Sequence, residues 1–266
     1  MVSARGHLAA SASSVNTVRQ QVFAGLEGDR YVVRLAKDRR EIESALRLRY
    51  EVFSVEMGDR KAKPGEAQIE FDEYDLRCNH LIVISKETGE TVGTYRLNSI
   101  DTAHSALGFY SANEFTIEDL PHEVLRDGIE IGRACIAREH RNTKVLFLLW
   151  KALLSYLEQS GKRYFFGCCS IFTQDADLGR KAFRQLIKEG YLHRDLSVIP
   201  CRNGVSLTGL DEQHARIELP SLFNMYLRIG ARVCGPPMMD REFGTIDFFV
   251  VFDVAKMSEK YRRMFS

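Results

Sequence analysis

The stretch E-I-G-R-A-C-I-A-R-E-H-R-N, from Glu130 to Asn142, decides the fold. It begins with mostly small or apolar residues at strand spacing and ends in a basic, polar turn. Directly after it comes the apolar run 145–157, which is too long for a strand. The pattern predicts a strand, a tight polar loop and a buried helix. Because the first backbone N–H groups of a helix lack partners within it, such a loop is suited to hold an anion.

The rest of the chain alternates between strand-like and helix-like segments. Strands are predicted at 31–36, 80–85, 90–98, 162–171 and 246–253, and helices at 41–57, 145–159, 177–189 and 219–229. The strands and helices follow one another in mixed order, and two early strands form a hairpin. This arrangement predicts an α/β fold whose sheet has strands of mixed direction. We expect a mobile tail at 1–30 and a single domain at 31–266, because no repeat or low-complexity linker interrupts the chain.

The composition is that of an ordinary globular protein. Of the 266 residues 45% are hydrophobic and 27% charged, and the net charge is +1. Neither the composition nor the net charge therefore points to a nucleic-acid-binding protein. No apolar run reaches the roughly 20 residues of a membrane span. The N-terminal stretch lacks the apolar core of a secretory signal. The six cysteines lack metal-ligand spacing, so we expect reduced, buried thiols in a cytoplasmic protein, with no metal and no permanently bound cofactor.

Six charged residues lie in or beside otherwise apolar elements. Since charged groups are seldom buried unless they are paired, we interpret them as one mutually neutralising cluster. The alternative is a set of unrelated surface ion pairs, each worth roughly 0–1 kcal/mol. The six are Arg49, Asp72, Asp75, Arg96, Glu130 and Arg133.

The order of these residues resembles a known family. The motifs R-Y-E-V-F (49–53), F-D-E-Y-D (71–75), G-T-Y-R-L (93–97) and E-I-G-R-A-C (130–135) are similar to those of acyl-homoserine-lactone synthases and their relatives in the GNAT (acyl-CoA N-acyltransferase) superfamily. The motifs at 109–115, 140–142, 166–170 and 234–243 look more like the ornithine lipid N-acyltransferase branch, whose members are often labelled hemolysins. The resemblance covers 31–253 and implies a GNAT fold, a mixed sheet flanked by helices.

Two departures bear on the substrates. The lactone synthases carry a tryptophan a few residues after the phenylalanine matched by Phe53, whereas the only tryptophan here is Trp150. This argues against lactone formation. The phosphate loop of the superfamily usually contains two glycines, and 138–143 contains none, which makes close backbone approach to a coenzyme A pyrophosphate harder. The resemblance therefore implies acyl carrier protein as the donor, with acyl-CoA as the alternative.

The resemblance implies an acyl transfer from a thioester to an amine. Glu130 is the predicted general base, acting directly or through a water, with Arg133 beside it in the catalytic pair. The arginines are suited to hold the acceptor carboxylate, and the aspartates a side-chain ammonium. Structural ion pairing of Glu130, loop fixing by the aspartates and core packing of Phe53 are the alternatives. The predicted substrate-binding residues are Arg49, Phe53, Asp72, Asp75 and Arg96.

The basic turn after the strand is predicted to bind the acyl donor. Its residues suit a pantetheine phosphate or an acidic carrier protein, although such runs are often only solvated. They are Arg138, His140, Arg141, Asn142 and Lys144. The basic segment 256–265 is compatible with peripheral contact at the inner face of the membrane, or with a solvated terminal helix.

The predicted function is transfer of a long fatty acyl group, with or without a 3-hydroxyl, from acyl carrier protein to the α-amine of L-ornithine, giving lyso-ornithine lipid. Another acceptor, such as glycine, lysine or tyrosine, is the first alternative. A lactone-type synthase and a non-catalytic lipid-binding protein are the others.

Overall fold

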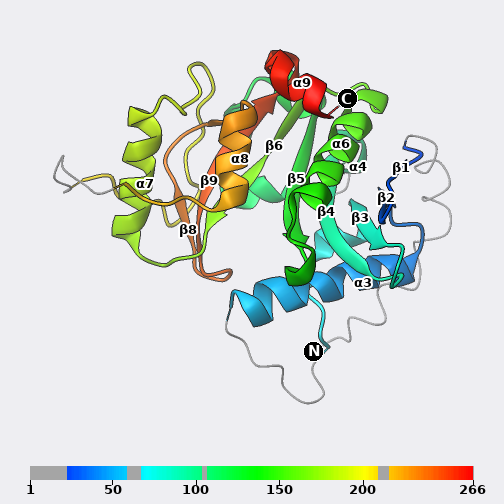
Figure 1. Ribbon diagram of the computed structural model, residues 1–266. Coiled ribbons are helices and arrows are strands. Elements are labelled where there is room, and N and C mark those ends of the chain that lie inside the picture. Colours follow the sequence, from blue (N-terminus) through cyan, green and yellow to red (C-terminus); the bar gives the residue numbers. More distant parts are fainter. Residues whose placement is uncertain (1–22, 59–66, 104–106, 209–215, 266) are drawn as a thin grey trace. The chain divides into compact units, whose positions relative to one another are not determined.

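The computed structural model describes residues 23–58, 67–103, 107–208 and 216–265. These divide into two compact units, drawn in sequence colours in Figure 1. The first unit takes its described residues from the chain up to Asn98 and from Ile131–Lys162, together with Phe265. The second unit comprises Ser99–Glu130 and Arg163–Met264. Strand β5 (Gly128–Ile136) contributes residues to both. The single domain predicted for 31–266 stays a prediction.

The first unit contains an antiparallel meander that leads to the second half of β5. Strand β1 (Leu26–Glu27) pairs with β2 (Tyr31–Leu35), β2 with β3 (Asn79–Ser85), and β3 with β4 (Thr91–Ser99). Strand β5 follows β4 in the strand order. All but β1 agree with the predicted strands. Strand β1 has only two residues, which is too short to leave a periodic pattern.

Folded structure begins earlier than the predicted boundary at residue 31. The Phe23 side chain is buried, and its ring packs edge-on against Tyr156 at 6.1 Å between centroids. Strand β1 lies within the predicted tail as well. The remainder of that tail, 1–22, lies outside the described residues.

Helix α3 (Arg39–Arg49) begins directly after its N-cap residue, Asp38. Asp38 accepts hydrogen bonds from Arg40 N at 2.8 Å and Glu41 N at 3.0 Å, which satisfies two N–H groups that a helix start leaves without partners. From Tyr50 to Glu56 the backbone continues as a π-helix. The helix predicted at 41–57 is therefore present, but its second half is wider than an α-helix. Insertions of this kind are frequent at functional sites.

Helix α6 (Thr143–Gln159) follows β5 after a 3-10 turn at Arg138–His140. Its buried face includes Leu149, Trp150 and Leu153. The strand, polar loop and buried helix predicted from the 130–157 stretch are confirmed.

The second unit contains the strand order β5, β6, β9, β7. Strand β6 (Tyr164–Ile171) is parallel to β5 and antiparallel to β9 (Thr245–Asp253), while β7 (Arg232–Val233) and β8 (Met238–Asp240) both pair with β9. The helices of this unit are α4 (Ile100–Ala103), α5 (His122–Arg126), α7 (Ala176–Lys188), α8 (Ser221–Ile229) and most of α9 (Glu259–Phe265). The predicted mixed α/β fold is confirmed.

The register of the second unit places two acids on one sheet face. Glu130 is opposite Phe166, and Asp247 is opposite Ser170. Since cross-strand partners share a face and residues two apart on a strand share a face, Glu130, Ser170 and Asp247 all project on the same side.

Within the described residues, no helix combines the length and apolarity that crossing a bilayer requires.

Candidate active site

The first unit holds a closed ring of alternating basic and acidic side chains. Going round it, each arginine contacts two acids and each acid contacts two arginines. The order is Arg49, Asp75, Arg96, Asp72, Arg133, Glu70 and back to Arg49. Three positive and three negative groups leave the ring neutral, which is the condition for keeping them together away from water.

The inner edge of the ring is the Arg49–Asp75 pair. Arg49 Nη1 and Nη2 donate to Asp75 Oδ1 and Oδ2 at 2.6 and 3.1 Å, and Arg49 Nε donates to Glu70. The residues are 0% and 2% exposed. A two-pronged contact of this type fixes the relative orientation of both side chains. Arg49 and Asp75 therefore form the rigid base of the ring.

Asp75 has several further anchors. Its Oδ2 accepts a hydrogen bond from Asp72 N at 2.9 Å, which closes the capping box of the 3-10 helix Glu73–Leu76. Its carbonyl oxygen lies 3.0 Å from His80 Nε2. Burial acts to raise the pKa of Asp75, but Arg49 and Arg96 outweigh it and hold that pKa well below its usual range. For His80, burial lowers the pKa of the imidazole against the opposing effect of Asp75.

The outer edge of the ring is partly accessible. Arg96 Nη1 donates to Asp72 Oδ1 at 2.5 Å, and Arg133 Nη2 donates to Asp72 Oδ2 at 3.2 Å. Arg133 Nε donates to Glu70 Oε1 at 3.1 Å. The side chains of Arg133 and Asp72 are 13% and 24% exposed. A substrate can reach this edge of the ring more readily than the Arg49–Asp75 edge.

Arg133 also has an unusual backbone. Its φ is +49°, in the left-handed region that residues other than glycine rarely adopt. Strain of this kind persists only where the surroundings enforce it, and it is concentrated at functional sites. The side chain of this residue donates hydrogen bonds to Glu70 and Asp72.

The ring brings together five of the six residues of the predicted cluster. Its third acid is Glu70, which the sequence pattern did not single out because it follows a polar loop rather than lying within an apolar element. The charge count gave no signal for Glu70, because the predicted cluster was already neutral with Glu130 as its third acid. Phe53 lies in the π-helix, half-buried, and packs with Leu48, Val52 and Cys135.

Glu130 belongs to the second unit and is held by the 3-10 helix Tyr110–Asn113. Its Oε2 accepts a hydrogen bond from Tyr110 N at 2.9 Å. Its Oε1 accepts from both Ser111 N and Ser111 Oγ at 2.7 Å. The side chain is buried, and these three bonds fix the plane of its carboxylate. Glu130 and Arg133 lie three residues apart on β5, and their joint role stays a prediction.

The predicted donor-binding turn is already partly occupied by internal contacts. Asn142 Oδ1 accepts from Lys144 N and Val145 N at 3.0 and 3.1 Å, so the side chain itself fills two anion-binding positions of the helix start. Arg141 pairs with Glu56 and donates to Ile136 O at 3.0 Å. His140 Nδ1 is hydrogen-bonded to the Tyr31 hydroxyl at 3.0 Å. Arg138 and Lys144 are exposed.

The fold and the matching family model define the class of protein. A model described as "Acetyltransferase (GNAT) domain" matches residues 48–151. That segment contains all six ring residues as well as Glu130. The chain is therefore a GNAT-type acyltransferase.

Two curated relatives narrow the class. The chain is 31% identical over 250 residues to the L-ornithine N(alpha)-acyltransferase of Brucella abortus (strain 2308), covering 86% of each protein. It is 30% identical over 247 residues to the enzyme of that name from Rhizobium meliloti (strain 1021), covering 86% of this chain and 81% of that protein. The chain belongs to the L-ornithine N(alpha)-acyltransferase family, which confirms the resemblance seen in the motifs.

A solved structure with a similar arrangement is that of FeeM, an N-acyl amino acid synthase from uncultured soil microbes. It is 9% identical to this chain, with a TM-score of 0.49, and the alignment covers 88% of this chain and 97% of that one.

Proposed function

We propose that the protein transfers a long fatty acyl group from acyl carrier protein to the α-amine of L-ornithine, giving lyso-ornithine lipid. The observation that carries the proposal is the 31% identity over 86% of both chains to a protein named L-ornithine N(alpha)-acyltransferase. The buried, hydrogen-bonded Glu130 and the charged ring give this chemistry the groups it needs.

The reaction is the attack of the amine nitrogen on the thioester carbonyl carbon. The C–N bond forms, the C–S bond breaks, the nitrogen loses a proton and the departing thiolate gains one. Glu130 takes the proton of the amine, directly or through a water, and Tyr110 and Ser111 hold its carboxylate in position. A positioned base typically contributes roughly 10²–10⁴-fold to such a step.

The accessible edge of the ring recognises the acceptor in this proposal. Arg133 binds the α-carboxylate of the amino acid, and Asp72 binds the side-chain ammonium of ornithine. The buried pair Arg49 and Asp75 supports that edge rather than touching the substrate, because both are already paired in the interior. Arg96 links the two edges through Asp72 and Asp75.

The donor approaches the turn between β5 and α6. Arg138 and Lys144 are exposed there and present positive charge to the phosphate of the pantetheine arm or to an acidic carrier protein. The absence of glycine from 138–143 supports a carrier protein over coenzyme A. We place the enzyme in the cytoplasm, with the basic 256–265 segment at the inner face of the membrane that receives its product.

Mass spectrometry of lipids from cells expressing the chain tests the acceptor and the product. Cells with the wild-type chain should accumulate N-acyl-ornithine, and cells with Glu130→Gln should not. The matched control is Ser111→Ala, which removes one hydrogen bond to the carboxylate but keeps the base, and should retain most of the product. Accumulation of an acylated glycine, lysine or tyrosine without the ornithine compound would replace the acceptor in the proposal.

The donor assignment is tested by steady-state kinetics with acyl carrier protein. The double variant Arg138→Glu, Lys144→Glu should raise the KM for the acylated carrier about tenfold while kcat changes little, because rim charges mainly affect association. Arg40→Glu, an exposed charge reversal on helix α3, is the control and should leave KM unchanged. An unaltered KM in the double variant would remove the docking role from this turn.

A further inference from the structure

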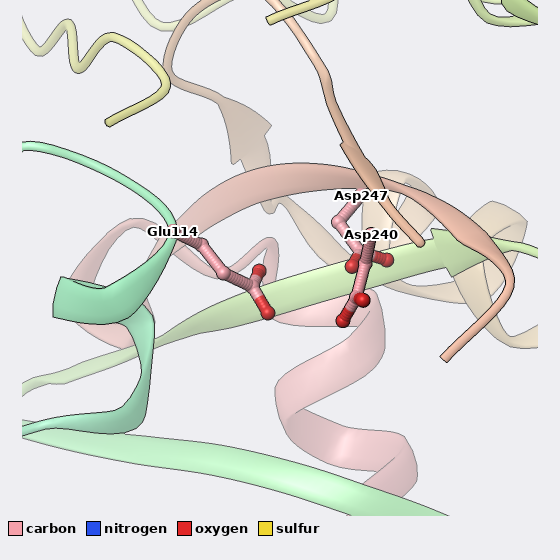
Figure 2. A group of neighbouring side chains, drawn as sticks. All are labelled: Glu114, Asp240 and Asp247. Carbon is pink, nitrogen blue, oxygen red and sulfur yellow. The ribbon is translucent and has the colours of Figure 1, made fainter. Parts of the chain in front are cut away.

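A second group of acidic side chains lies in the second unit, outside the predicted site. Glu114 follows the 3-10 helix Tyr110–Asn113, Asp240 ends β8, and Asp247 lies in β9. Figure 2 shows the three carboxylates turned toward one another, and one oxygen of each lies within 4.8 Å of the others. The residues are 2%, 7% and 3% exposed, respectively. Three carboxylates are thus gathered in the interior.

The surroundings of Asp247 do not neutralise its charge. One oxygen, Oδ2, accepts from Thr245 Oγ1 at 3.2 Å. The other, Oδ1, is buried, and no described residue donates a hydrogen bond to it at bonding geometry. The neighbouring charges that act most strongly on Asp247 are those of Glu114 and Asp240, both acidic. This is the reverse of the ring, where every acid contacts two arginines.

We propose that Glu114, Asp240 and Asp247 form a binding site for a hard divalent cation of the Mg²⁺, Mn²⁺ or Ca²⁺ type. All-oxygen ligand sets suit these ions. Oxygens within 4.8 Å of one another are close enough to reach about 2.0–2.6 Å from a shared ion after small side-chain rotations. A divalent cation balances two of the three negative charges, whereas the ammonium group of an amino acid balances only one. Asp247 is buried and its Oδ1 has no hydrogen-bond partner at bonding geometry among the described residues, so this carboxylate has an oxygen available for an ion.

Such an ion would brace the segment that holds Glu130. Glu114 lies three residues after Ser111, whose N–H and hydroxyl both bond to Glu130. Cys168 Sγ, on β6, lies 3.7 Å from Ser111 Oγ and so packs against the same segment. Through Glu114, the cation would fasten this segment to β8 and β9. The proposal of this cation site holds whichever amino acid is the acyl acceptor.

Metal binding to the full-length protein tests the inference. The protein is stripped with EDTA and desalted, then titrated with MnCl₂, MgCl₂ or CaCl₂ by calorimetry, with thermal unfolding measured in parallel. We expect one ion per chain and a Tm that rises with metal concentration by mass action. Asp247→Asn should lose both effects and, in EDTA, should be at least as stable as the wild type, because an uncharged amide replaces a buried acid beside Glu114 and Asp240. Asp119→Asn, an exposed acid of the same unit, should behave as the wild type.

Three results would overturn the site. They are the absence of binding for all three ions at millimolar concentration, unchanged affinity in Asp247→Asn, and a Tm increase with L-ornithine but not with metal that Asp247→Asn abolishes. The last result would assign the cluster to an ammonium group instead. Should Asp247→Asn fail to fold, Asp240→Asn and Glu114→Gln answer the same question, and Mn²⁺ paramagnetic resonance with the wild-type protein reports binding directly.

Discussion

At the residue scale, Arg133 combines a strained backbone with a functional side chain. The left-handed φ of +49° is an energetic cost of about 1–2 kcal/mol for a residue with a Cβ atom. Glycine at this position would avoid that cost. The chain carries glycine one position earlier, at Gly132, and retains arginine where the side chain reaches Glu70 and Asp72. The arginine therefore serves the ring at the expense of local stability.

A pair of substitutions separates the two roles of Arg133. Arg133→Ala removes the ring contacts and keeps the backbone strain, whereas Arg133→Gly removes both. The glycine variant should therefore be more stable than the alanine variant by about 1 kcal/mol, as measured by urea unfolding. Both should lose acyl transfer to a similar degree. Equal stability of the two variants would show that the backbone at this position is not strained.

The ring acid Asp75 and the neighbouring His80 predict that the free energy of unfolding depends on pH in two steps. Burial lowers the pKa of His80 below its usual 6.5, so the unfolded chain binds more protons and the free energy of unfolding should fall as the pH drops below about 6.5. The pKa of Asp75 is lowered from its usual 3.8, so its stabilisation is present above that value and is lost as the pH falls further.

Denaturant unfolding over a pH series checks both steps. His80→Asn should flatten the upper step and leave the lower one. Asp75→Asn should cost about 3–5 kcal/mol at neutral pH, because it leaves buried arginines without their partner, and should flatten the lower step. A wild-type stability that stays constant between pH 7 and 5 would contradict the buried neutral state of His80.

Residues were predictable from sequence where they stood out against an apolar background. Arg49, Arg96 and Arg133 did so, and all three are in the ring. Glu70 did not, because it comes shortly after the polar stretch 58–68 of the sequence rather than within an apolar element. Asp247 interrupts the apolar strand 246–253 and gave the same type of signal as Glu130, yet the family motifs offered no role for it.

At the element scale, the start of helix α6 shows how a cap and an anion site compete. Asn142 Oδ1 already accepts from the N–H groups of Lys144 and Val145. A donor phosphate at this turn would therefore rely on exposed side chains such as Arg138 and Lys144. The loop differs in this respect from a glycine-rich one, whose backbone amides hold the phosphate.

Two substitutions of Asn142 distinguish capping from donor binding. Asn142→Ala should destabilise the protein by about 1 kcal/mol through loss of the cap. Asn142→Asp keeps the cap, so its stability should stay within a few tenths of a kcal/mol of the wild type, but its negative charge should raise the KM for the phosphate-bearing donor. Thermal unfolding and steady-state kinetics report the two effects. A normal KM for Asn142→Asp would place the phosphate away from this helix start.

Long, periodic elements were predictable and short ones were not. Strands β3, β4, β6 and β9 and helices α6 and α7 agree with the pattern because each buries a continuous face. Strands β1, β7 and β8 have two or three residues each and owe their existence to neighbours already in place. The π-helix 50–56 could not be foreseen either, since its apolar spacing also fits an α-helix.

At the scale of the whole molecule, the chain divides into two compact units. The ring belongs to the first unit and Glu130 to the second, and β5 carries both Glu130 and Arg133. The motifs shared with the wider superfamily are spread over 49–135, and those of the ornithine lipid branch extend to residue 243. This spread explains why the predicted site rests on the resemblance rather than on any single local pattern.

The most direct test of the account is a competition assay with the purified protein. Acyl carrier protein and coenzyme A carrying the same acyl chain are supplied with equal amounts of L-ornithine, L-lysine, glycine and L-tyrosine, and the products are identified by tandem mass spectrometry. The account predicts ornithine acylated on its α-nitrogen, drawn mainly from the carrier protein, and a rate reduced roughly 10²–10⁴-fold in Glu130→Gln. Preferential acylation of another amino acid, or near-normal turnover by Glu130→Gln, would contradict it.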